Sequence, residues 1–355
     1  MTNISPGSGW ETVINVKPQG SAALAVDTKS TDAGQAGEFL QEQLKESGPF
    51  RYVGYASFRY GLPHFKWDYD YPIFRLQPNV LGILTNGRSM FLHIYDTQVY
   101  NPSQYNRYAS FIQAMNQIDE DYHFSDLNET GLDSKLFPLL NARYILLDKT
   151  IPKYRSDVVA LMQGRKIVYS DDLVDVLESV NDQPTAAWIV HDVRTAPTAS
   201  VLAMMNATDF EPHSTAIVET SVDGIQPAVA GANESAIVTD HEPETIRITA
   251  TAASAGLLVM SEVYEPDWHA YVDGKKVDIL PTDYAFRGVP IAAGTHVVEL
   301  RYEPASLKYG LWLTIGAMLA WLAIALWQGW RRIPQIRERV RAGEGDVPTD
   351  DQVVA

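Results

Sequence analysis

The stretch YGLWLTIGAMLAWLAIALWQGW, residues 309–330, decides the architecture of this chain, because no residue in it carries a formal charge. At about 1.5 Å per residue a helix of this stretch is roughly 33 Å long, which matches a hydrocarbon core of about 30 Å. Tyr309 and Trp312 lie near one end, and Trp327 and Trp330 near the other, as interfacial aromatic residues do. A helix buried in a soluble protein usually keeps a polar stripe. The stretch therefore predicts one transmembrane helix, with the lipid bilayer as its partner.

The charges around this stretch predict an orientation. Basic residues crowd the eleven positions that follow it: Arg331, Arg332, Arg337, Arg339 and Arg341. Such a cluster stays on the cytoplasmic side, so we expect a single-pass protein of the cell membrane, with residues 1–308 outside the cytoplasm and a cytoplasmic tail at 331–355. The N-terminus shows no secretory signal, since its longest apolar run is Ala22 to Val26. Two interpretations stay open: an upstream membrane region is missing from this chain, or the head is cytosolic and the helix is a tail anchor.

Composition excludes several classes of protein. The chain has 28 Lys and Arg against 44 Asp and Glu, a net charge of −16, which argues against a nucleic-acid partner. Cysteine is absent, which excludes disulfides, thiolate metal sites and cysteine nucleophiles.

The pattern of residues before the apolar stretch predicts an α+β chain in two domains. After an extended lead-in at 1–31, helices alternate with strands over 32–182, which favours an N-terminal α/β domain. Short strands then recur over 183–305 and favour an antiparallel β-sandwich. We expect helices from Asp32 to Gly48-Pro49, from Pro102 to Met115, from Ser134 to Asn141 and from Ala199 to Asn206, an ordered loop at 59–80, and a hairpin turn at Asp273-Gly274.

No nucleotide-binding, metalloprotease or nucleophile-elbow motif is present, and no two histidines are three or four residues apart. We therefore predict no cofactor, no metal ligand and no catalytic residue. The most distinctive cluster, within residues 94–108, surrounds the start of a predicted helix and contains Tyr100, Asn101, Tyr105, Arg107 and Tyr108. Amides at a helix N-terminus, one Arg and several aromatic faces suit an anionic or sugar-bearing ligand. The competing interpretation is that Tyr105 and Tyr108 only pack the helix against the sheet.

A second aromatic cluster, VYEPDWHAYVDG at 263–274, contains Trp268. We expect Trp268 to fill the sandwich, and stacking on a sugar is the alternative for it.

The stretch GLLVMSEVYEPDWHAYVDGKKVDILPTDYAFRGVPIAAGTHVVELRYEPASLKYG, residues 256–310, closely resembles the C-terminal domain of the bacterial YfhO-like membrane protein family. Weaker matches precede it in the same order: GPFRYVGY (48–55), VYNPSQYNRY (99–108), NARYILLD (141–148) and QPTAAWIV (183–190). Asp267 stands where the family usually has Gly. The resemblance implies that the head is extracytoplasmic.

Members of that family look like type C glycosyltransferases, with many membrane helices, an acidic motif in an early extracytoplasmic loop and a lipid-linked sugar donor. This chain contains neither that loop nor the multi-helix region, so no catalytic residue can be transferred to it. The resemblance implies the extracytoplasmic part of such an enzyme, capping a membrane active site that transfers sugar to an envelope polymer or lipid. Its expected partners are then a separate multi-spanning subunit and an envelope glycan or lipid-linked sugar. The alternative is a non-enzymatic, membrane-anchored glycan-binding module.

Overall fold

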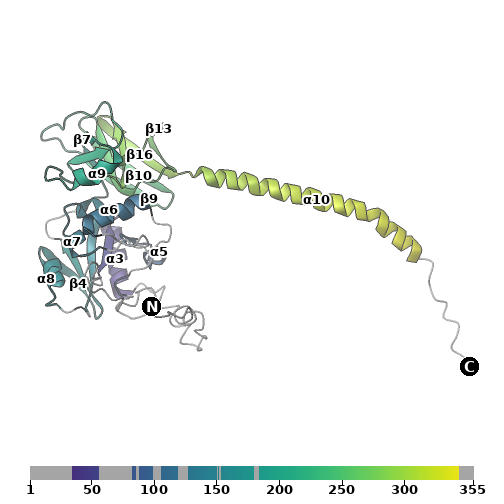
Figure 1. Cartoon of the computed structure of the whole chain (residues 1–355), viewed down its shortest axis with the longest axis horizontal. Helices are drawn as coiled ribbons and strands as arrows, with labels where there is room; N and C mark the ends of the chain where they lie inside the picture. Colours follow the sequence, from purple (N-terminus) through teal and green to yellow (C-terminus); the bar gives the residue numbers. More distant parts are fainter. Residues whose placement is uncertain are drawn as a thin grey trace, which may run out of the picture. The chain divides into compact units, whose positions relative to one another are not determined.

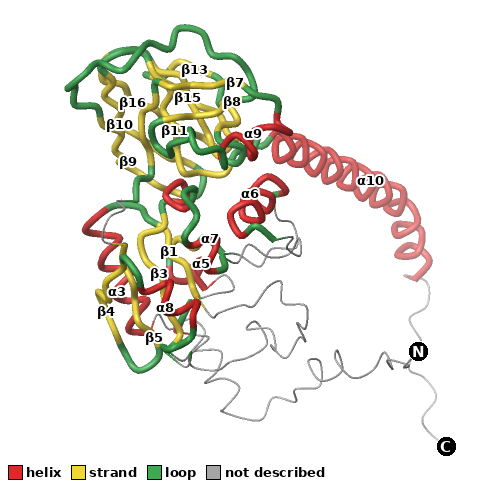
Figure 2. The backbone as a smooth tube through the Cα atoms, turned by 60° about the vertical axis from the view of Figure 1, so that its left-hand side comes forward, coloured by secondary structure: helices red, strands yellow, loops and turns green. Residues whose placement is uncertain are grey.

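The computed structural model describes residues 34–55, 82–84, 88–98, 105–118, 127–149, 151, 153–179 and 184–343, with side chains described as far as Trp330 (Figures 1 and 2). The predicted lead-in at 1–31 and the predicted loop at 59–80 lie outside these residues. The chain divides into a compact unit, Met1–Arg301, and a second unit, Tyr302–Ala355.

The first part of the compact unit is built on a mixed five-stranded sheet. Its strands are β1 (Arg51–Tyr55), β2 (Tyr95–Asp96), β3 (Ala142–Asp148), β4 (Arg165–Ser170) and β5 (Val174–Ser179), in the order β2-β1-β3-β5-β4. β1 pairs in parallel with β2 and β3, whereas β5 pairs antiparallel with β3 and β4. Side chains alternate across the sheet, so Tyr144 and Leu146 enter one hydrophobic cluster while Ile145 and Leu147 enter another. Both faces are therefore buried.

Helices cover both faces of this sheet. α3 (Gly34–Ser47) and α5 (Arg88–Leu92) bury Leu40 and Leu92 in the cluster that contains Tyr144. α6 (Asn106–Asn116), α7 (Glu129–Leu132) and α8 (Ser156–Met162) contribute to the other cluster. The stop predicted for the first helix is confirmed, because Gly48 has φ +79° and its N–H donates to the carbonyl of Leu44.

The single helix predicted over Ser134 to Asn141 is wrong. The chain forms the short helix α7 and then the 3₁₀ turn η2 (Phe137–Leu140). Asn128 begins α7 by accepting a hydrogen bond from the N–H of Gly131 at 2.8 Å. Pro138 then sits in the first turn of η2, and Asn141 ends it in the left-handed conformation at φ +53°.

The second part of the compact unit is the predicted β-sandwich. One sheet has the order β13-β12-β16-β10-β9, and the other β6-β11-β15-β14-β8-β7. The strands are β6 (Ala187–Val190), β7 (Asp192–Thr195), β8 (Thr215–Val218), β9 (Ser235–Glu242), β10 (Thr245–Ala252), β11 (Gly256–Val263), β12 (Trp268–Val272), β13 (Lys275–Val277), β14 (Leu280–Thr282), β15 (Phe286–Ile291) and β16 (Gly294–Tyr302). β9, β10 and β16 pair antiparallel, as do β12 and β13, and also β6, β11, β15, β14 and β8, whereas β7 and β8 are parallel. The predicted helix between them is present as α9 (Thr198–Met205).

The six-stranded sheet is buried on both faces. Along β11, Leu258 and Met260 pack between the two sandwich sheets, whereas Leu257 and Val259 join the cluster that contains α6 and α8. One apolar core therefore continues from the sandwich into the α/β part. The predicted boundary at 182 and 183 stays a prediction, because residues 180–183 lie outside the described residues.

The predicted hairpin turn is confirmed between β12 and β13. Asp273 and Gly274 have φ +50° and +79°, the two left-handed residues that a type I′ turn requires. The Asp273 side chain also accepts a hydrogen bond from the N–H of Val297 at 2.9 Å, which fixes the turn against β16.

The second unit contains one helix, α10 (Ala305–Gly343). Its part Ala305–Trp330 is long enough and apolar enough to cross a membrane, and none of it is buried against other described residues. The helix continues past the predicted end of the span at Trp330 for 13 residues, through the Arg-rich segment.

Candidate functional site

The α/β part and the sandwich meet across the outer face of the six-stranded sheet, and we call this contact the domain junction. Phe111 of α6 meets Phe286 of β15 edge to face, with ring centroids 5.1 Å apart. Both side chains are fully buried. In both overall views α6 lies between the two groups of sheets (Figures 1 and 2). This apolar contact positions the polar groups that surround it.

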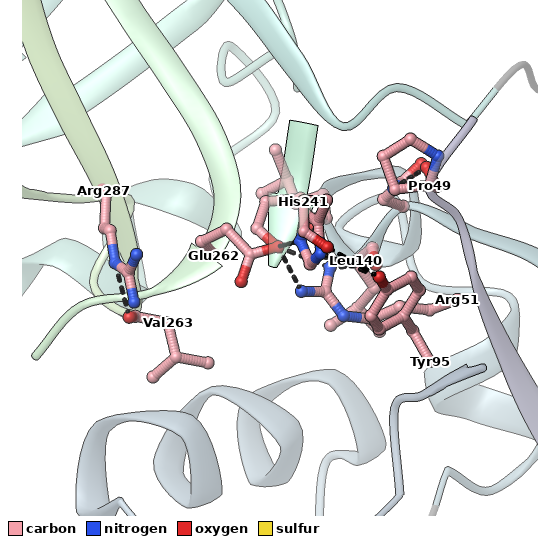
Figure 3. A network of polar contacts seen from close by, with 11 residues as sticks. Pro49, Arg51, Tyr95, Leu140, His241, Glu262, Val263 and Arg287 are labelled. Carbon is pink, nitrogen blue, oxygen red and sulfur yellow. Dashed lines mark hydrogen bonds and ion pairs between the residues drawn. The ribbon is translucent and has the colours of Figure 1, made fainter. Parts of the chain in front are cut away.

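A partly buried polar network crosses the domain junction beside this contact (Figure 3). Arg51, the first residue of β1, donates from Nη2 to Oε1 of Glu262 on β11 at 2.8 Å. Its Nη1 donates to Oγ of Ser261 at 3.0 Å and to the carbonyl of Leu140 at 3.2 Å. The guanidinium thus joins β1, η2 and β11, which are far apart in sequence.

His241 and Tyr95 complete the environment of Glu262. Nε2 of His241 lies 3.1 Å from Oε1 of Glu262, and Nδ1 lies 3.0 Å from the hydroxyl of Tyr95. Burial by itself raises the pKa of Glu262, but the charge of Arg51 and the hydrogen bond to His241 outweigh it and hold that pKa well below its ordinary value. Glu262 is therefore an anion at neutral pH. Burial, and then the charge of Glu262, raise the pKa of Tyr95.

Arg287 lies on the other side of Glu262 (Figure 3). It projects from β15, is only 4% exposed, and donates from Nε to the carbonyl of Val263 at 2.9 Å. Its guanidinium lies over the ring of Trp268, 4.1 Å from the centroid. Burial lowers the pKa of Arg287 to about 10, while Glu262 opposes that shift, so the group stays cationic at neutral pH. Nη1 is buried and has no hydrogen-bond partner among the described residues.

The structure brings two separately predicted residues together around this guanidinium. Trp268 from β12 lies under Arg287, and Tyr105, immediately before α6, lies within electrostatic reach of Arg287. Tyr105 is half-exposed. Burial raises the pKa of its hydroxyl, the charge of Glu265 adds to that shift, and the charge of Arg287 opposes it. We call Tyr105, Glu262, Trp268 and Arg287 the junction site.

Arg107 and Tyr108, also predicted as ligand-binding, make contacts that fix α6. Arg107 pairs with both carboxylate oxygens of Glu219 and donates to the carbonyl of Tyr284 at 2.8 Å. Its guanidinium lies 5.4 Å from the centroid of the Tyr284 ring. The hydroxyl of Tyr108 donates to the carbonyl of Thr97 at 2.6 Å. These contacts agree with the interpretation that the cluster packs the helix against its neighbours. They do not test whether the cluster binds a ligand. Tyr100 and Asn101 lie outside the described residues.

The sequence interpretation missed Arg51, His241, Glu262 and Arg287. Two of them left a signal, since Glu262 follows Ser261 and the apolar run LLVM in one strand, and Arg287 lies in the strand FRGVPI. A charge inside a strand that is otherwise apolar needs a partner. Arg51 and His241 have no such signal, because Arg51 is the first residue of its strand and His241 lies among the polar residues that end β9.

The chemistry of the junction site suits a ligand rich in hydroxyl groups. A carboxylate accepts hydrogen bonds, a guanidinium donates them, and an indole and a phenol offer apolar faces. Within the residues that the structure describes, no three His, Asp or Glu side chains gather as metal ligands.

Residues 177–314 match the family described as bacterial membrane protein YfhO. No curated protein and no solved structure matches the chain. The matched residues hold the sandwich, three of the four residues of the junction site and the first part of α10. The predicted resemblance is confirmed over these residues, which are similar to the bacterial membrane protein YfhO family.

Proposed function

We propose that this chain is the extracytoplasmic part of a YfhO-like membrane glycosyltransferase and holds a saccharide acceptor at the junction site. Catalysis takes place in a multi-spanning partner, which carries a sugar on a lipid-linked donor. The cluster of five arginines after Trp330 supports the orientation, because such clusters stay in the cytoplasm and leave the head outside. The family match supports the membrane setting.

One observation carries the assignment of the acceptor to the junction site. Arg287 is buried, stacked on Trp268, and has a donor, Nη1, without a partner among the described residues. Leaving a buried donor unsatisfied costs about 1–3 kcal/mol. Because Nη1 is buried, the junction has to open for a sugar hydroxyl to accept from it. The same hydroxyl then donates to the neighbouring carboxylate of Glu262, and the cost of the unsatisfied donor is removed. Tyr105, which comes from the other side of the junction, gives the sugar a second contact.

The test measures sugar transfer in membrane vesicles from cells in which the full chain is the only copy. The probe is a radiolabelled polyprenyl-phosphate hexose, and the product is labelled envelope polymer. Replacing Tyr105 by Ala removes one aromatic contact, so transfer should fall roughly three- to tenfold, mainly through the acceptor KM. Tyr154→Ala is the matched control, because Tyr154 is an exposed tyrosine of the α/β part (86% exposed, against 50% for Tyr105). Equal transfer by the two variants would exclude Tyr105 from acceptor binding.

Direct titration separates this proposal from the alternative of a glycan-binding module. Envelope oligosaccharides are titrated into the full chain in detergent, without the partner. Binding that is weakened by Tyr105→Ala, together with unchanged sugar transfer in the vesicles, would favour the module. Loss of both favours the proposed acceptor role.

A further inference from the structure

A second feature of the compact unit is a cleft at the opposite edge of the five-stranded sheet. The Arg51 network lies at the end of the sheet that holds β1 and β2, whereas the cleft borders β4 and β5. Its volume is about 570 Å³, within the range of small-molecule sites. One wall consists of residues 132–138 and 163–165 of the α/β part, and the other of residues 211–213 from the sandwich.

Hydrogen bonds to the backbone hold the basic residues of the cleft in place. Arg165 donates to the carbonyls of Leu161 and Leu132, each at 2.9 Å. Lys135 donates to the carbonyl of Phe210 at 3.1 Å and also to that of Ala207. Lys135 therefore ties the α/β wall to the loop that forms the sandwich wall. Because both walls are fixed in advance, a ligand pays little conformational entropy on entering.

The formal charges of the cleft balance. Lys135 and Arg165 face two acidic residues, Asp133 and Glu211, and Nη1 of Arg165 lies 3.4 Å from Oδ1 of Asp133. An anion would meet the two carboxylates, and a cation would meet the two basic groups. Neither sign of charge is favoured.

The remaining groups at the cleft suit a ligand with many hydroxyls. Gln163 offers an amide that both donates and accepts, and Glu211 offers two acceptor oxygens. Both side chains are exposed and make no hydrogen bond to another residue that the structure describes. Pro138, which is partly exposed, adds an apolar surface beside the buried Phe137, and this surface can cover the C–H face of a sugar ring.

From this balance of charge and these open donors and acceptors we propose that the cleft binds a neutral saccharide. This inference is independent of the proposed acceptor at the junction site, because the cleft shares no residue with that site. It assigns the α/β part a second carbohydrate site at the other end of the same sheet.

The experiment uses the full chain in detergent micelles and saturation-transfer NMR of the sugar. The probes are three neutral tetrasaccharides, from maltose, cellulose and chitin, and one anionic probe, a tetrasaccharide of galacturonate. We expect at least one neutral probe to bind. Replacing Gln163 and Glu211 together by Ala removes two hydrogen-bonding side chains and should weaken binding about tenfold. Lys276→Ala, at an exposed position of β13, is the control and should bind as the unmodified chain does.

Two further measurements distinguish the possible outcomes: the salt dependence of sugar binding, and sugar binding by a variant of the junction site. Affinity for a neutral sugar should change less than about twofold between roughly 50 and 500 mM salt, because no charge is paired on binding. Binding that persists in the double variant but is lost in Tyr105→Ala would move the sugar to the junction site and overturn the assignment of the cleft. Preferential, salt-sensitive binding of the anionic probe would also overturn it, as would the absence of binding by every probe at millimolar concentration.

Discussion

Asp283, in the turn between β14 and β15, is expected to make the folded chain less stable as the pH rises. Its side chain is fully buried, and Oδ1 accepts one hydrogen bond, from the N–H of Ile217 at 2.8 Å. Oδ2 is buried without a partner among the described residues. Burial raises the pKa of Asp283 from 3.8 to about 7, against the smaller opposing effect of the hydrogen bond from Ile217. The folded chain therefore keeps a proton that the unfolded chain releases.

The sign and size of the effect follow from proton linkage. Because the pKa is higher in the folded state, the contribution of Asp283 to stability is fully present below pH 3.8 and is lost as the pH rises toward 7. With these two pKa values, the free energy of unfolding falls by about 2.5 kcal/mol between about pH 5 and pH 8. Asp283→Asn keeps the acceptor for Ile217 but cannot ionise. The difference in stability between the unmodified chain and the Asn variant should change by the same amount over this pH range.

The assay is thermal unfolding of the full chain in detergent, followed by near-ultraviolet circular dichroism at several pH values. Taking the difference between the two proteins cancels the titration of all groups that they share, and also the constant cost of burying the amide. Asp278→Asn is the control, because Asp278 is exposed and its charge is hydrated in both states. A difference that stays constant within about 0.5 kcal/mol from about pH 5 to pH 8 would show that Asp283 is already ionised in the folded chain and would refute the reasoning.

Two further substitutions test the junction and the sandwich. Glu262→Gln leaves Arg51 and His241 without their anionic partner and should lower the free energy of unfolding by about 2 kcal/mol near neutral pH. Because the pKa of Glu262 is depressed in the folded chain, this loss should shrink as the pH falls below the ordinary range of a glutamate, and unfolding midpoints at two acidic pH values measure it. Gly288→Ala places a Cβ that collides with Oγ1 of Thr282, so it should destabilise the sandwich by about 1–3 kcal/mol. An unchanged melting temperature would show that β14 shifts to accommodate the added methyl group without loss of stability.

Short stretches of sequence predicted the features that local geometry governs. The uncharged run 309–330 predicted the apolar part of α10, and the pair Asp273-Gly274 predicted the hairpin because a type I′ turn needs two left-handed residues. Gly48-Pro49 likewise predicted the end of α3. The prediction failed at Ser134 to Asn141, where the chain forms only the 3₁₀ turn η2, with Pro138 in its first turn and the left-handed Asn141 at its end. Family resemblance also needed only an ordered set of residues, so it was accessible from the sequence.

Tertiary structure alone decided the junction site and the cleft. Arg51 and Glu262 are separated by 211 positions, and no periodicity in the sequence relates them. Tyr105 and Trp268 were identified as two unrelated clusters, and only the packing of α6 on β15 brings both to Arg287. The physical reason is that turns and helix ends depend on a few neighbouring dihedral angles, whereas a buried charge finds its partner through the complementary shapes of whole elements.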